Sequence, residues 1–289
     1  MNETLSTIEG RPTLRLERVI RHSVERVWTA ITDPEQLGKW YPAKVISMDF
    51  TPGGRIRFDY GGGMILLATI IEIDAPRVFA FSETPPKEFF RESANLVRIE
   101  LEPHPKGCLL TFTHTFSDRP AAASYTTGWN ACLDQLGPIF DGDAVEPTDM
   151  GVVHEYWIKQ FGLDEGRIVT EGGTTSVRFE RQLMMQPRGK AWSVIAQGDH
   201  LQPGTMTPPL LVPAGLSVGP ITEIELETRI DYNDAQGGRV NWGFSDGAGG
   251  VRIDLVHVSS RAPELLDSWK NCMESLVARI VAADYESGA

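Results

Sequence analysis

Hydrophobic and polar residues alternate near the start of the chain, where Leu14, Leu16 and Ile20 are separated by charged neighbours. A period of two predicts a strand with one buried face. A short helix through Val27, Trp28 and Ile31 is expected next. A second helix should begin at Asp33-Pro34-Glu35-Gln36, because Asp33 can cap it, Pro34 suits its first turn and Gln36 completes a capping box.

From Ile46 to Phe116 the pattern predicts one strand after another, separated by turn sequences rich in proline and glycine. Consecutive strands without intervening helices indicate an antiparallel sheet. A long helix should follow from about Pro120, with one apolar stripe that contains Tyr125, Trp129, Cys132, Leu133 and Leu136. Gly137-Pro138 is expected to end or kink this helix, because proline lacks an amide donor and clashes with the preceding turn.

Three segments of this first half recur in the second half in the same order. Trp129, Cys132 and Leu136 return with the same spacing as Trp269, Cys272 and Leu276. The segments 14–18 and 110–114 are echoed by 177–181 and 253–257, so that His114 corresponds to His257. Three matches in one order indicate an internal repeat. The second copy is shorter, and a proline-rich stretch from Gln202 to Pro220 replaces its middle, which should therefore be an edge or a loop.

The predicted fold class is therefore α+β, with two domains that each place a curved antiparallel sheet around a long C-terminal helix. We assign the first domain to residues 1–165 and the second, shorter one to residues 166–289. The first assignment includes a helical extension, because residues 156–162 read as a short amphipathic helix.

Several phrases of the first half resemble one known family. They are the segments 27–34, 37–41, 52–58, 71–77 and 128–133, which read VWTAITDP, LGKWY, PGGRIRF, IEIDAPR and GWNACL. Together they resemble the START-like (SRPBCC) superfamily, in particular domains of the Hsp90 ATPase activator homologue type. The resemblance implies the helix-grip fold for residues 14–140. The second half lacks the double-glycine turn and the Trp-Tyr pair, so its membership rests on the repeat.

The resemblance also implies a cavity between the sheet and the long helix, because members of this superfamily bind lipids, sterols, polyketides or other apolar molecules. The alternative is that the same side chains only fill a core. The predicted ligand-binding residues are the inward-facing aromatic and apolar positions of the strands and the long helix: Trp40, Phe58, Tyr60, Phe79, Phe81, Phe112, His114, Tyr125, Trp129 and Leu133.

His114 lies at a position where alternation demands an apolar side chain, so its ring nitrogens need partners. Such a histidine is most often satisfied within the core, and a polar contact to a ligand is the second interpretation. The sequence assigns no acidic residue to orient it for acid–base catalysis. Cys132 and Cys272 lie on the buried stripes, where cysteine behaves as a small hydrophobic residue.

Composition narrows the remaining possibilities. The net charge of −12 and the absence of a basic patch disfavour nucleic acid as a partner. The histidine and cysteine spacing suggests no metal site, and no motif suggests a cofactor or a nucleophile. The longest apolar run, residues 64–68, is far short of the roughly 20 residues of a membrane span. No secretory signal is apparent, so we expect a cytoplasmic protein.

Three functions remain. The leading hypothesis is a non-catalytic binding protein for an apolar or amphipathic small molecule, with its pocket in the first domain. The second is an enzyme of the cyclase or hydratase kind that uses the same cavity, which should contain at least two converging ionisable groups. The third is an interaction module that modulates a chaperone ATPase, which should present an exposed apolar or charged patch. A chaperone and a second copy of the chain are the possible protein partners.

Overall fold

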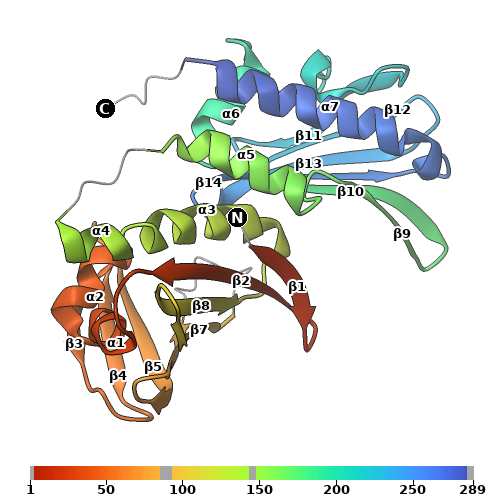
Figure 1. Ribbon diagram of the computed structural model, residues 1–289. Coiled ribbons are helices and arrows are strands. Elements are labelled where there is room, and N and C mark those ends of the chain that lie inside the picture. The colour runs from red at the N-terminus through yellow and green to blue at the C-terminus, as the bar shows by residue number, and fades with distance from the viewer. Residues whose placement is uncertain (1–2, 85–92, 143–147, 285–289) are drawn as a thin grey trace. The chain divides into compact units, whose positions relative to one another are not determined.

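The computed structural model describes residues 3–84, 93–142 and 148–284 and divides the chain into two compact units, Met1–Asp149 and Met150–Ala289 (Figure 1). Each unit contains one antiparallel sheet with helices, so both domains have the predicted α+β fold. The elements of the first domain are β1 (Thr4–Ile8), β2 (Arg11–Ile20), α1 (Val24–Thr32), α2 (Pro34–Trp40), β3 (Lys44–Met48), β4 (Arg55–Asp59), β5 (Ile65–Asp74), β6 (Val78–Thr84), β7 (Asn95–His104), β8 (Gly107–Thr115), η1 (Arg119–Ala121), α3 (Ala122–Leu133) and α4 (Leu136–Asp141).

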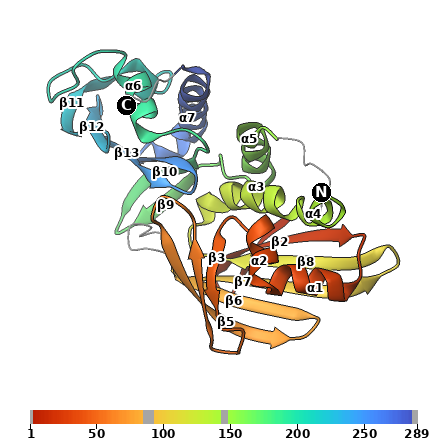
Figure 2. The ribbon, with the colours of Figure 1, turned by 90° about the vertical axis from the view of Figure 1, so that its left-hand side faces the viewer.

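The first sheet has the strand order β1-β2-β8-β7-β6-β5-β4-β3, and every neighbouring pair is antiparallel. Figure 2 shows the curved strands of this sheet with α1 and α2 lying against them. Local signals fix the beginning of α2 as predicted, because the Asp33 carboxylate accepts a hydrogen bond from the Gln36 amide at 3.0 Å. The three glycines after β4 have positive φ angles and form the β4–β5 turn.

The core of the first domain lies between the sheet and the helices. The inward-facing residues of the strands, such as Leu14, Phe79 and Phe112, have no solvent exposure. The long predicted helix is divided into α3 and α4, which are separated at Asp134 and Gln135. Pro138 accounts for the break, because it has no amide to donate to the carbonyl of residue 134.

The second domain consists of α5 (Met150–Gln160), β9 (Arg167–Glu171), β10 (Thr174–Gln182), α6 (Arg188–Ala196), η2 (Pro209–Leu211), β11 (Val218–Glu225), β12 (Arg229–Asp234), β13 (Arg239–Gly247), β14 (Gly250–Val258) and α7 (Ala262–Ala282). Its sheet order, β9-β10-β14-β13-β12-β11, repeats the order β1-β2-β8-β7-β6-β5 of the first sheet. The described residues of the second domain contain no counterpart of β4 and β3.

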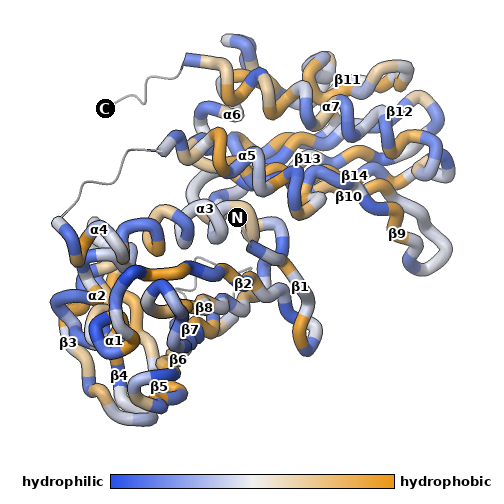
Figure 3. Tube along the Cα trace, viewed as in Figure 1, coloured by the Kyte–Doolittle hydropathy of each residue, from blue (hydrophilic) through white to orange (hydrophobic). Residues whose placement is uncertain are grey.

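The strand registers agree with the sequence echoes. His114 pairs with Leu14 across β2 and β8, and His257 pairs with Val177 across β10 and β14. Alternating hydrophobic and hydrophilic positions can be followed along these strands in Figure 3. The two sheets therefore place the echoed segments at the same positions of the same topology.

Helix α7 is unbroken and lies along one face of its sheet (Figure 1), with Trp269 completely buried. The proline-rich stretch from Gln202 is mostly irregular, with the short η2 turn and the beginning of β11 at the sheet edge. The prediction that it forms no central strand is confirmed, because proline cannot donate to a sheet ladder.

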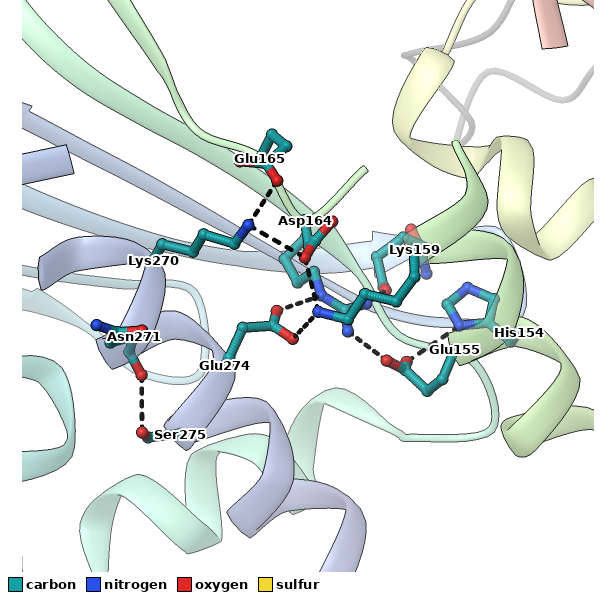
Figure 4. A network of polar contacts seen from close by, with 11 residues as sticks. His154, Glu155, Lys159, Asp164, Glu165, Lys270, Asn271, Glu274 and Ser275 are labelled. Carbon is teal, nitrogen blue, oxygen red and sulfur yellow. Dashed lines mark hydrogen bonds and ion pairs between the residues drawn. The ribbon is translucent and has the colours of Figure 1, made fainter. Parts of the chain in front are cut away.

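Helix α5 lies in the second compact unit, which begins at Met150, whereas the predicted boundary between the domains is residue 165. Charged contacts hold this helix (Figure 4). Arg181 of β10 is 1% exposed and pairs with Glu155 of α5 and Glu274 of α7. Lys159 of α5 donates to Glu274 at 2.8 Å. The sequence reads α5 as amphipathic, and only tertiary contacts decide which core it joins.

None of the helices in the part of the chain that the structure describes is long and apolar enough to cross a membrane.

Candidate functional site

A pocket of about 220 Å³ lies between the sheet of the first domain and α3. Strand and loop residues form one wall and α3 forms the other, which is where the resemblance predicts a cavity. The lining residues are Pro42, Tyr60, Glu83, Asn95, His114, Ser124, Tyr125, Gly128, Trp129 and Cys132.

Glu83, near the end of β6, is the acidic residue of the pocket and is 7% exposed. The hydroxyl groups of Tyr41 and Tyr60 both donate to its Oε1, at 2.6 and 2.9 Å. Burial raises the pKa of Glu83, and the two tyrosine hydrogen bonds oppose this rise. Burial and the neighbouring carboxylate also raise the pKa of both tyrosines well above 10, so that their hydroxyls remain protonated donors.

His114 of β8 forms a second polar point in the pocket and is 2% exposed. The indole Nε1–H of Trp129 donates to its Nδ1 at 3.1 Å. Burial, with a smaller contribution from Arg11, lowers the pKa of His114 to about 3. The imidazole is therefore neutral at physiological pH, and because Nδ1 is an acceptor, its proton lies on Nε2.

Two further pocket residues have polar atoms without partners. Asn95 Oδ1 and Ser124 Oγ are buried, and neither atom makes a hydrogen bond within the described residues. An unpaired buried polar atom costs about 1–3 kcal/mol, and in native structures it calls for an explanation such as a ligand or a water molecule.

Four of the ten predicted ligand-binding residues line this pocket: Tyr60, His114, Tyr125 and Trp129. The other six lie in the packed core and do not border it: Trp40, Phe58, Phe79, Phe81, Phe112 and Leu133. Trp40 illustrates the difference, since its indole donates to the Ala30 carbonyl and packs α2 onto α1. Alternation identified inward-facing residues correctly, but only three-dimensional packing divides them between core and pocket.

Sequence reasoning missed Glu83, although a signal was present. Glu83 continues the inward row of Phe79 and Phe81 on β6, so it breaks an apolar alternation in the same way as His114 does on β8. Asn95 opposes Glu83 across the β6–β7 ladder. Gly128 and Cys132 complete the α3 wall and carry no such signal.

The equivalent position in the second domain is built differently. Asp234 of β12 lies at the register position of Glu83, since Tyr232 pairs with Val240 as Phe81 pairs with Val97. Its Oδ2 lies 3.0 Å from Nε2 of His257, whose Nδ1 accepts from Trp269 at 3.0 Å. A Cβ at Gly238 would lie 2.4 Å from Asp234 and 2.8 Å from His257.

The carboxylate of Asp234 therefore accepts hydrogen bonds from groups of its own domain. Burial would raise the pKa of Asp234, but the amides of Gly238 and Gln236, together with His257, lower it overall. The adjacent interior is filled by Tyr232 and Trp242, which donate hydrogen bonds to the Leu211 carbonyl and to the Tyr232 hydroxyl respectively.

The chemistry available in the first-domain pocket is hydrogen bonding by neutral donors and acceptors around one carboxyl group. The imidazole of His114 is a poor base, because its pKa lies far below neutrality. The thiol of Cys132 is unreactive, since burial raises its pKa to about 12. Within residues 3–84, 93–142 and 148–284, no cluster of three or more histidine, cysteine or acidic residues could hold a metal ion.

Residues 21–141 match the family described as Activator of Hsp90 ATPase homolog 1-like protein. The match lies within the first domain and includes all ten described residues that line the pocket. The predicted resemblance of this half to SRPBCC-type domains is confirmed.

Several solved structures are similar to the chain. CalU16 from Micromonospora echinospora is 19% identical, covers 56% of this chain and 95% of its own, and has a TM-score of 0.45. A protein from Mesorhizobium loti is 21% identical over 46% of this chain and 99% of its own, with a TM-score of 0.41. A conserved protein of unknown function from Enterococcus faecalis is 17% identical over 55% and 90%, with a TM-score of 0.45. No curated protein matches the chain.

Proposed function

We propose that the first domain binds a compact amphipathic small molecule in its pocket. The premise is the match of residues 21–141 to the Activator of Hsp90 ATPase homologue 1-like family. The family suggests roles in ligand binding or in modulating the ATPase of Hsp90. The observation that carries the choice is the pocket of about 220 Å³ with its polar groups and aromatic walls.

The volume and lining favour a small ligand with at least one polar group. The pocket is smaller than the roughly 300–1,000 Å³ typical of sites for drug-sized molecules. Tyr125 and Trp129 offer apolar surface, and Glu83, Asn95, Ser124 and the Nε2–H of His114 offer hydrogen-bonding partners. Such a ligand would satisfy atoms that have no partner within the described residues.

A second candidate is an enzyme, because several ionisable residues, Glu83 and His114 among them, converge on the cavity. The raised pKa of Glu83 favours it over His114 as the group that would accept or donate a proton. We place binding first because neither the two tyrosines nor His114 titrates near neutrality, and a proton-transfer site works best with matched pKa values.

A chaperone-modulating role would use another surface. Ile65, Leu67 and Ile71 of β5 are 40–54% exposed, which is a row of apolar side chains outside the cavity. Their substitution by serine therefore separates such a role from ligand binding.

The binding function is tested by titrating the intact protein with N-phenyl-1-naphthylamine, a compact uncharged dye that fluoresces in apolar surroundings. Gly128→Leu is the sharpest variant, because a Cβ at Gly128 meets no atom within 4 Å and its side chain should fill the pocket. Leucine also favours a helix more than glycine does. We expect at least about a tenfold weaker dye affinity, which corresponds to about 1.4 kcal/mol.

Matched controls come from the second domain. Ser268→Leu introduces the same residue at the corresponding position of α7, immediately before Trp269. His114→Leu and His257→Leu each remove the acceptor of a tryptophan indole, but only His114 lines the pocket. Dye binding should fall only for the first-domain variants, and native mass spectrometry should detect a co-purified small molecule in the parent protein. Absence of dye binding, or equal losses from both sets, would refute the proposed function.

A further inference from the structure

We propose that the ligand of the first-domain pocket carries a protonated amine, which is held against Glu83 between aromatic walls. This inference rests on the proposed binding function and specifies the chemical class of the ligand.

The described residues that line the pocket include an acidic side chain and no lysine or arginine. Glu83 is the only acidic residue among these ten described residues. The other titratable groups that border it are Tyr60, His114, Tyr125 and Cys132, and Tyr41 lies behind Glu83. Those with shifted pKa values, Tyr41, Tyr60, His114 and Cys132, stay uncharged near neutral pH. Among the described lining residues, an anionic ligand would therefore meet a carboxyl group and no lysine or arginine side chain to balance it.

The geometry of Glu83 leaves one oxygen for a ligand. Both tyrosine hydroxyls donate to Oε1, and Oε2 makes no hydrogen bond within the described residues. Two donors hold the carboxylate in place, yet they do not cancel its charge. Burial disfavours its ionised form, so a cationic partner inside the pocket would stabilise the carboxylate.

The aromatic walls suit the same class of ligand. Tyr60, Tyr125 and Trp129 border the pocket, and the Tyr125 ring stands edge-on to His114, with centroids 4.8 Å apart. An ammonium group is attracted to the faces of tyrosine and tryptophan, and the attraction strengthens where water is excluded. Aromatic rings around one carboxylate thus favour a cation over a neutral group, and a neutral group over an anion.

The test is displacement of N-phenyl-1-naphthylamine from the intact protein at pH 7.5 by three probes that share an indole and differ in their end group. These probes are tryptamine (ammonium), tryptophol (hydroxyl) and indole-3-acetate (carboxylate). We expect tryptamine to displace the dye at concentrations at least about tenfold lower than tryptophol, and indole-3-acetate to be the weakest. Glu83→Gln keeps an acceptor for the tyrosines and should abolish the preference for tryptamine.

Asp234→Asn is the control, because it makes the same acid-to-amide change at the equivalent position of the second domain and should leave the order of the probes unchanged. Indole-3-acetate or tryptophol binding as well as tryptamine, or no displacement by any of the three, would overturn the inference while dye binding still supports the pocket. The order measured on the parent protein decides the question even if Glu83→Gln fails to fold.

Discussion

The two domains place an acidic residue at the same register position and use it in opposite ways. Glu83 borders a pocket and accepts hydrogen bonds from two tyrosines, whereas Asp234 contacts His257 and two backbone amides. The difference follows from the missing strands. Tyr41 and Tyr60 flank β3 and β4, which have no counterpart among the described residues of the second domain.

What the domains share is equally informative. In each, a tryptophan of the C-terminal helix donates to a buried histidine of the preceding strand. In each, an arginine of the second strand pairs with an acid five residues after that tryptophan, as Arg18–Asp134 and Arg181–Glu274. These contacts join sheet to helix and are scaffold. The pocket, by contrast, depends on elements that only the first domain retains.

The largest expected effect is the loss of stability when the tryptophan of either C-terminal helix is replaced, which compares a filled interior with one that contains a pocket. Trp269 is fully buried and packs against Trp242 with ring centroids 5.9 Å apart, whereas Trp129 is 7% exposed and borders the pocket. Replacing either by alanine should cost about 3–5 kcal/mol, with Trp269→Ala at the upper end. Hydrogen–deuterium exchange read by mass spectrometry resolves each domain separately. A loss below about 1 kcal/mol for Trp269→Ala would contradict the packing.

The next effect tests the two acids directly. Asp234→Asn should destabilise the second domain by about 1–3 kcal/mol, because the single acceptor oxygen of an amide cannot accept both from the backbone amides of Gln236 and Gly238 and from the Nε2–H of His257. Glu83→Gln should change the stability of the first domain by less than about 1 kcal/mol, since burial already disfavours its charge and glutamine still accepts from the tyrosines.

The pH dependence of stability separates the roles of Asp234 and Glu83 further. Because the folded-state pKa of Asp234 is lowered, its contribution is present at pH 7 and is lost as the pH falls below about 4. The cost of Asp234→Asn should therefore shrink in acid, as measured by exchange at several pH values. Equal costs for the two amide substitutions at pH 7 would show that the acids have the same role.

The smallest effect concerns the strand-to-helix ion pairs. Glu274 is 27% exposed and also pairs with Lys159, whereas Asp134 is 54% exposed. Glu274→Ala should cost about 1–2 kcal/mol, and Asp134→Ala should cost less than about 0.5 kcal/mol, because exposed ion pairs contribute little. Exchange in β10 and β2 would report both. A larger loss for Asp134→Ala would reverse the proposed ranking.

Local and periodic signals in the sequence were enough to predict many of the elements and the correspondence between the two halves. Strict alternation marked β2, the Asp33 capping box marked α2, and the echoes between the two halves anticipated that His114 and His257 occupy matching positions. These features are local or periodic, and each depends on side chains within a few residues or on a repeated pattern. The exclusion of the proline-rich stretch from the centre of the sheet was also predicted from local sequence, since a missing amide donor disfavours a central strand wherever it occurs.

Packing in three dimensions divides the inward-facing residues into those that fill the core and those that border the pocket. Phe58 and Tyr60 share one row of the same strand pattern, yet Phe58 is fully buried in the core and Tyr60 reaches Glu83. The role of Glu83 depends on Tyr41, Tyr60 and α3 meeting at one point, and those segments are far apart in the sequence. The assignment of α5 to the second domain depends in the same way on Arg181 and Glu274. Periodicity fixes the direction of a side chain, whereas the volume left in front of it is set by every element packed around that point.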